Sequence, residues 1–355
     1  SEDMIDVSGA PNKKLRWEKT HSVNAGFDFA VLNQAINLSV DYYYRKGVDL
    51  IGTQMLPLET GFEMLTVNWA SMRNQGVEVA LSTRNVHTKN FMWTTNFNFA
   101  YNNNKVLKEA LREDALEPGR EGYPAGALFA LKTAGLDEEG YPMFQDKDGK
   151  AVSAMEFFKL QEWGFGATDL TARERRELYT YVGTADCPYT GGFNNTFTYK
   201  AFELGVNFSF DFGGKVRSQP TYSIVDFDKG RNTNRDILNR WTPENTETIF
   251  PVLLSQNERL DEYMWYSNQN EIYRNLDIWI RDLNYVRLQN IRLGYTLPTN
   301  FSRKLGMTSA TIAIEGRNLL VFGSSYKNYL DPETMSNAYA TPAPKSVTLS
   351  LNLNF

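Results

Sequence analysis

The sequence has no apolar run close to the roughly 20 residues that a membrane-spanning helix needs, and its mean hydropathy is −0.45. A helical membrane protein is therefore excluded. Cysteine is almost absent, because Cys187 is the only one, and a single thiol permits neither an internal disulfide nor a thiolate metal cluster. The two histidines, His21 and His87, are far apart in sequence, so we expect no metal site built on histidine.

Sequence motifs typical of enzymes are absent as well. The sequence contains no HExxH, P-loop, GxSxG or dinucleotide-binding motif. Residues 146–149 (DKDG) resemble the start of a calcium loop but lack the later glutamate, so a turn is predicted there. The net charge of −5 is not a nucleic-acid signature. We therefore expect no catalytic residues, no cofactor, no metal and no nucleic-acid partner.

Alternation of apolar and polar residues is abundant instead. It is clearest in 347–355, where nine residues tilted by roughly 40° would cover about 23 Å, close to the apolar height of an outer-membrane barrel. This segment alone fits equally an edge strand of a soluble sandwich. The pattern predicts nine strands, at 15–31, 36–45, 76–83, 91–101, 193–199, 202–212, 291–297, 312–322 and 347–355.

The connections between these strands alternate in length. Short turns are predicted at 32–34, 85–90, 200–201 and 298–307, and long loops at 47–73, 104–192, 214–281 and 323–346. In an up-and-down meander, alternate connections lie at the same end, so all long loops would share one side. The sequence therefore predicts an all-β protein, a transmembrane antiparallel up-and-down β-barrel with long extracellular loops. Short helices are expected within the loops at 171–182, where Thr171 and Glu174 have capping-box spacing, and at 234–241.

Candidate substrate-binding residues fall into two sets. Strand parity directs Asp28, Asp41, Glu78, Glu203, Asp211, Arg292, Glu315 and Arg317 toward the barrel lumen, and of these we select Asp41, Glu78, Arg292 and Arg317. The alternative is that these charges only neutralise one another or a plug domain. Aromatic residues of the long loops, chiefly Trp163, Tyr189, Trp265 and Tyr266, could stack on sugars or pack against peptides, or simply pack within the loops.

The number of predicted strands indicates whether these residues contain the whole barrel. Bacterial single-chain barrels have an even number of strands, whereas about nine are predicted here. The first residues, 1–3 (SED), do not resemble a signal peptide. We therefore expect residues 1–355 to be the C-terminal part of a larger barrel domain, with an N-terminal plug and early strands lying outside them.

Several motifs resemble one family in the same order along the chain. They are LRWEK at 15–19, NWASMRNQGVEV at 68–79, EGYPAGALF at 121–129, YVGTADCPYTGGFNNTFTYKAFEL at 181–204, YVRLQNIRLGYTLP at 285–298, GRNLLVF at 316–322, DPE at 331–333 and the terminal Phe355. They resemble the SusC-like (RagA/SusC-type) TonB-dependent transporters of the Bacteroidetes outer membrane.

This resemblance implies a multi-pass barrel of 22 strands in the outer membrane, filled by an N-terminal plug and energised through TonB. It also implies a SusD-like lipoprotein as an outer lid, and import of oligosaccharides or peptides. The part seen here would be about the last nine strands. Two other classes remain open from the sequence: a passive porin and a soluble β-rich glycan-binding module.

Overall fold

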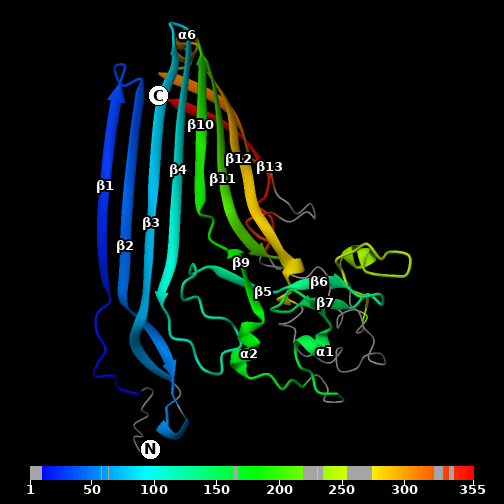
Figure 1. Ribbon diagram of the computed structural model, residues 1–355. Helices are drawn as coiled ribbons and strands as arrows, with labels where there is room; N and C mark the ends of the chain where they lie inside the picture. Colours follow the sequence, from blue (N-terminus) through cyan, green and yellow to red (C-terminus); the bar gives the residue numbers. More distant parts are fainter. Residues whose placement is uncertain are drawn as a thin grey trace, which may run out of the picture.

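The computed structural model describes residues 10–56, 58–62, 64–162, 167–218, 230, 235–253, 274–323, 331–335 and 340–355. Within these residues nine long strands form one antiparallel sheet in which chain order is also spatial order (Figure 1). They are β1 (Lys19–Val31), β2 (Ile36–Met55), β3 (Met64–His87), β4 (Phe91–Lys108), β10 (Tyr189–Tyr199), β11 (Phe202–Arg217), β12 (Ile280–Thr296), β13 (Ser309–Phe322) and β14 (Ser346–Asn354). The predicted nine-stranded meander is confirmed.

The connections also lie where loop length predicts. Short turns join the strands at one end of the sheet, and the long insertions gather at the other end, where β1 begins (Figure 1). The tightest turn links β10 to β11 through Lys200, whose φ of 54° is the left-handed backbone that closes a two-residue hairpin. The turn between β12 and β13 contains the short helix α6 (Thr299–Lys304).

Several strands extend beyond the predicted limits. Residues 47–73 were expected to be a loop, but β2 continues to Met55 and β3 starts at Met64. The expectation was wrong because this part of the hairpin has register shifts around Gly47 and Leu50, which interrupt the two-residue period. In the same way β4 continues to Lys108 and β12 starts at Ile280.

The long connections contain structure of their own, which we call the loop lobe (127–184 and 235–279). It has a two-stranded sheet, β5 (Ala127–Leu131) with β9 (Tyr179–Thr184), and a three-stranded sheet of β6 (Thr133–Leu136), β7 (Pro142–Gln145) and β8 (Ala151–Val152). Its helices are α1 (Ala154–Phe157), α2 (Ala172–Glu177), η2 (Arg235–Asn239) and η3 (Asp277–Trp279), and η1 (Leu58–Thr60) lies in the β2–β3 loop. The expected helices are thus confirmed but shorter, because the chain enters β9 soon after α2.

The loop lobe holds a hydrophobic core. Phe144, Leu276 and Trp279 are fully buried in it, and Phe157 and Phe158 pack against Phe144 with ring centroids 4.8 and 5.0 Å away. This packing joins two loops that are far apart in sequence. Long loops that were predicted as irregular therefore form a folded unit at the long-loop end of the sheet.

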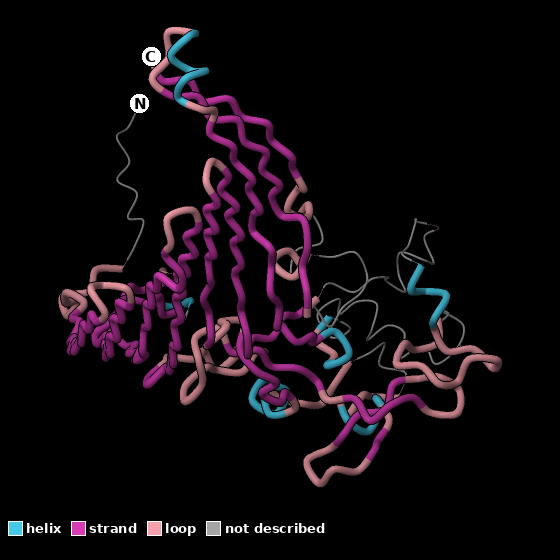
Figure 2. The backbone as a smooth tube through the Cα atoms, turned by 90° about the horizontal axis from the view of Figure 1, so that it is seen from above, coloured by secondary structure: helices cyan, strands magenta, loops and turns pink. Residues whose placement is uncertain are grey.

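The nine-stranded sheet is curved and does not close on itself (Figure 2). β1 and β14 each pair with a single neighbour among the described residues. In the described part of the chain, no helix combines the length and the apolar character that crossing a membrane requires.

Candidate functional site: the polar face of the sheet

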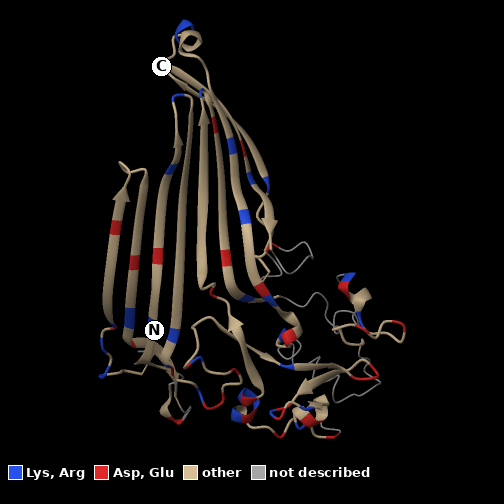
Figure 3. Cartoon of the chain, turned by 45° about the horizontal axis from the view of Figure 1, so that its top comes forward, with Lys and Arg blue, Asp and Glu red and all other residues tan. Residues whose placement is uncertain are grey.

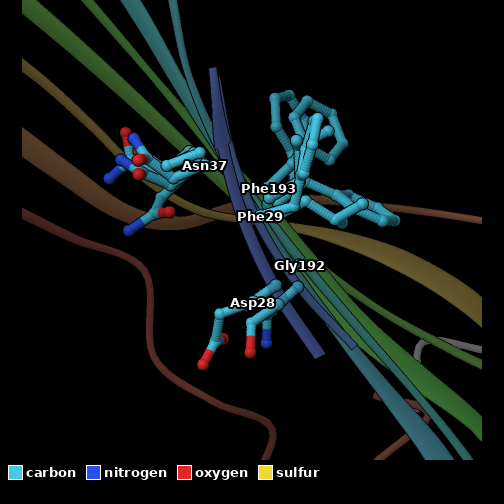
Figure 4. A pocket seen from close by; sticks show the side chains of 17 residues that line it. Asp28, Phe29, Asn37, Gly192 and Phe193 are labelled. Carbon is cyan, nitrogen blue, oxygen red and sulfur yellow. The ribbon is translucent and has the colours of Figure 1, made fainter. Parts of the chain in front are cut away.

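Strand register divides the sheet into two chemically different faces. One row pairs Phe27, Val40, Val79 and Phe99, and the next row pairs Gly26, Asp41, Glu78 and Ala100. We call the first the apolar face and the second the polar face. Figure 4 shows the separation directly, with Phe29 and Phe193 on one side of the strands and Asp28 and Asn37 on the other.

The apolar face is not covered by any other part of the described chain. In β14, Val347, Leu349 and Leu351 are 69%, 75% and 62% exposed, and the rings of Phe27 and Phe29 are exposed on β1. A surface of this size in water would promote aggregation, whereas in a barrel wall it contacts lipid. The apolar face is therefore the membrane-facing side, and the polar face lines the lumen.

Aromatic residues mark both edges of the apolar face. Strand β10 begins with Tyr189 and ends with Tyr199, and its ten residue steps at a tilt of roughly 40° cover about 25 Å, the height of the apolar band in outer-membrane barrels. Tyr189 stacks on Tyr101 with ring centroids 5.1 Å apart. The prediction that Tyr189 lies in a loop is wrong, because the strand begins one residue after Pro188 and directs the ring toward the membrane.

The polar face carries the four predicted charged residues in two places. Asp41 and Glu78 lie directly opposite each other on β2 and β3. Arg292 of β12 pairs with Glu203 at 3.0 Å, and Arg317 of β13 pairs with Glu315 at 2.5 Å. The structure therefore places these four on one face, but β4, β10 and β11 separate Asp41 and Glu78 from Arg292 and Arg317. Figure 3 shows acidic and basic residues distributed along the strands of the sheet.

A further charged cluster was not predicted as part of the site. Arg287 of β12 is only 2% exposed, and its guanidinium donates to Asp331 and, at 3.0 Å, to Glu333. The hydroxyl of Tyr285 donates to Asp211 at 2.6 Å and lies 3.2 Å from the carboxylate of Glu333. We call these five residues the loop tether, because Asp331 and Glu333 belong to the loop between β13 and β14.

The loop tether explains how the guanidinium of Arg287 can be buried on the lumen side. Removing a guanidinium from water is favourable only when carboxylates replace the lost hydration, and here two carboxylates do so. Arg287 lies outside the strand predicted at 291–297, and a register shift between Leu288 and Asn290 places it with Tyr285 on the polar face. The carboxylate partners were not predictable, because they lie 44 and 46 residues away in a loop without periodicity.

A broad hollow of about 610 Å³ follows the sheet from β1 to β11. Its polar lining consists of Asp28, Asn37, Ser39, Ser82, Asn96, Asn98, Asn194 and Asn207. Amide side chains both donate and accept hydrogen bonds, so this surface can bind water or neutral polar molecules. The remaining predicted aromatic residues, Trp163, Trp265 and Tyr266, lie outside the described residues.

Comparisons with known proteins agree with this architecture. The family model described as "TonB dependent receptor-like, beta-barrel" matches residues 4–128. The TonB-dependent receptor P3 of Formosa agariphila is 27% identical over 97% of this chain and 35% of its own length. The TonB-dependent receptor SusC of Bacteroides thetaiotaomicron is 26% identical over 97% of this chain and 32% of its own length. The chain thus spans about a third of the length of the curated relatives it matches.

Solved structures share the fold. The structure of the RagAB peptide transporter superposes with a TM-score of 0.74 at 23% identity, covering 100% of this chain and 38% of that chain. The RagAB peptide importer in its closed-closed state also gives 0.74, at 24% identity over 100% and 38% of the two chains. The fold and its two faces define a wall section of an outer-membrane β-barrel. Within that class, the chain is similar to SusC-like TonB-dependent receptors, which are receptors and transporters rather than enzymes.

Proposed function

We propose that the whole protein is an active importer of the outer membrane, energised through TonB, and that residues 1–355 form the C-terminal part of its barrel. One observation carries the proposal: a sheet with a lipid-compatible outer face and a charged, amide-rich inner face. A wall of this kind separates a polar conduit from the bilayer. Among the described residues the outer edges of β1 and β14 are unpaired and expose backbone hydrogen-bonding groups, so further strands would have to complete the wall, and we propose a plug inside it.

The substrate class we propose is oligosaccharides or peptides. Relatives named SusC and RagAB, the latter described as a peptide importer, support this choice. On the polar face, Asp41 and Glu78 offer carboxylates to cationic groups, while Arg292 and Arg317 offer guanidiniums to anionic groups. Paired charges together with amides suit peptide termini and sugar hydroxyls alike.

We further propose a SusD-like surface lipoprotein as the outer lid. Its contact surface would be the loop lobe, which is folded around its own core at the extracellular end of the sheet. Trp163, Trp265 and Tyr266 remain proposed contacts to substrate or lid, since aromatic side chains are enriched in such interfaces.

Uptake by cells tests this function. Cells that lack the receptor and are complemented with the full-length gene should accumulate labelled oligopeptides or oligosaccharides, and deleting the TonB gene should abolish this accumulation. Accumulation that continues without TonB would support a passive porin instead. Replacing Asp41 and Glu78 together by Asn and Gln should weaken uptake of cationic substrates more than that of neutral ones, and equal effects would remove these two residues from the proposed site.

A further inference from the structure

Three basic side chains form a row on the apolar face near the long-loop end of the sheet. Lys46 of β2 pairs with Arg73 of β3, and Arg73 pairs with Lys105 of β4. Each lies four residues from an apolar-face position of its own strand, such as Tyr42 or Tyr101, with no register shift between them. All three therefore project from the membrane-facing side. We call them the cation row.

The cation row has no counter-charge in the described part of the chain. Its members form no ion pair and no side-chain hydrogen bond there, and the buried Nε of Arg73 has no hydrogen-bond partner. The nearby carboxylate of Asp49 is already paired with Arg16 at 2.6 Å. Like charges directly opposite each other in a sheet are destabilising, so an anion bound beside the row would stabilise it.

The height of the cation row identifies the kind of anion. The stacked pair Tyr101 and Tyr189 marks the edge of the apolar band. Lys105 lies four residues further along β4, about 13 Å along the strand and about 10 Å in height at a tilt of roughly 40°. Headgroups and interface occupy the first 5 to 8 Å or so beyond the hydrocarbon, within reach of long basic side chains that extend along the surface.

We propose that the cation row binds the phosphate of a phosphorylated glycolipid in the outer leaflet. The guanidinium of Arg73 can hold two phosphate oxygens, and the two lysines supply the remaining charge. Between the cation row and the aromatic edge lies a row of Tyr44, Gln75 and Asn103, whose hydroxyl and amides can bind the sugar of the same headgroup. The site is continuous with the lipid-facing surface and faces away from the lumen, so it is independent of transport.

Lipid retention by the full-length protein tests the site. The triple variant K46Q/R73Q/K105Q is compared with a control of equal charge change, K89Q/K200Q/K304Q, whose three exposed lysines lie at the short-turn end. A milder variant, K46Q/K105Q, keeps the half-buried Arg73 in case the triple variant fails to assemble. Each protein is purified from its own outer membrane, and bound phosphorylated glycolipid is counted by native mass spectrometry and phosphorus analysis.

We expect wild type and control to retain the same amount of glycolipid, the triple variant to retain less than a fifth of it, and the double variant to lie between. Wild-type retention by the triple or double variant would overturn the proposal. So would loss of lipid from the short-turn control alone, which would mean that the charged lipid contacts lie at the other end. Loss of a co-purifying lipoprotein with unchanged lipid would assign the cation row to a protein partner and also overturn it.

Discussion

Arg287 and Glu333 are 46 residues apart in sequence, yet Nε of Arg287 donates to Oε1 of Glu333 at 3.0 Å. The same guanidinium also donates to Asp331, which is 8% exposed in its side chain, so the contact is largely shielded from water. It attaches residues 331–335 to the polar face of β12. This loop is therefore held at the lumen rather than extending away from the barrel.

Replacing Arg287 by Gln should release that loop. A buried carboxylate left without its partner costs about 3 to 5 kcal/mol, so the free energy of unfolding of the full-length protein should fall by about that amount. Amide hydrogen exchange in residues 331–335 should accelerate at least tenfold. The comparison is R317Q, which breaks the pair with Glu315 where Arg317 is 61% exposed and should cost less than about 1 kcal/mol. Equal effects of R287Q and R317Q would contradict the loop tether.

Neighbouring residues of β2 test the assignment of the two faces. Leu38 lies on the apolar face opposite Phe29, near the middle of the band, whereas Ser39 lies on the polar face and donates to Asp41. L38R should therefore reduce the free energy of unfolding in detergent by about 2 to 4 kcal/mol. S39R places the same side chain beside Asp28 and Asp41 and should cost much less. The opposite order of stability would mean that the faces are reversed.

Helix α2 should respond to pH through its cap. The backbone N–H and the hydroxyl of Thr171 donate to Glu174, with Lys159 nearby, and these contacts hold the pKa of the Glu174 carboxyl below its ordinary value of 4.5. Because the folded-state pKa is lowered, the stabilisation is present above about pH 4.5 and is lost as the pH falls through the folded-state value.

Amide exchange of residues 172–177, corrected for intrinsic rates, should thus increase more steeply below pH 4.5 in wild type than in E174Q, whose amide does not titrate in this range. T171A should raise exchange at neutral pH, because it removes the hydroxyl that accepts from the N–H of Glu174 at 3.3 Å. A pH profile shared by wild type and E174Q would argue against the capping box as the cause.

Most of the barrel wall was predictable because its chemistry repeats every second residue. The alternation in 91–101 and 202–212 places Phe97 and Phe210 on the same face, and the structure brings their rings to 6.3 Å. The same rule found Asp41, Glu78, Arg292 and Arg317 on the polar face. It could not fix strand ends, since register shifts near Gly47 interrupt the period without ending the strand.

The loop lobe was not predictable in the same way. Its core joins Phe144 to Trp279 across more than a hundred residues, and no local pattern specifies such a contact. The loop tether shows the same limitation, because a register shift between Leu288 and Asn290 moves Arg287 to the polar face and its carboxylate partners lie in a distant loop. Tyr189 was assigned to a loop because proline and glycine surround it, although its strand begins immediately after Pro188.

Single-cysteine labelling in intact cells tests most directly whether the sheet is a barrel wall with its loop lobe outside the cell. In the full-length protein with Cys187 and every cysteine outside residues 1–355 replaced by Ser, we introduce D148C in the loop lobe or K89C in the turn between β3 and β4, both at exposed positions. A membrane-impermeant maleimide should label D148C in intact cells, and K89C only after the outer membrane is permeabilised. Labelling of K89C in intact cells with protection of D148C, or equal labelling of both, would contradict a barrel wall whose loop lobe faces outside.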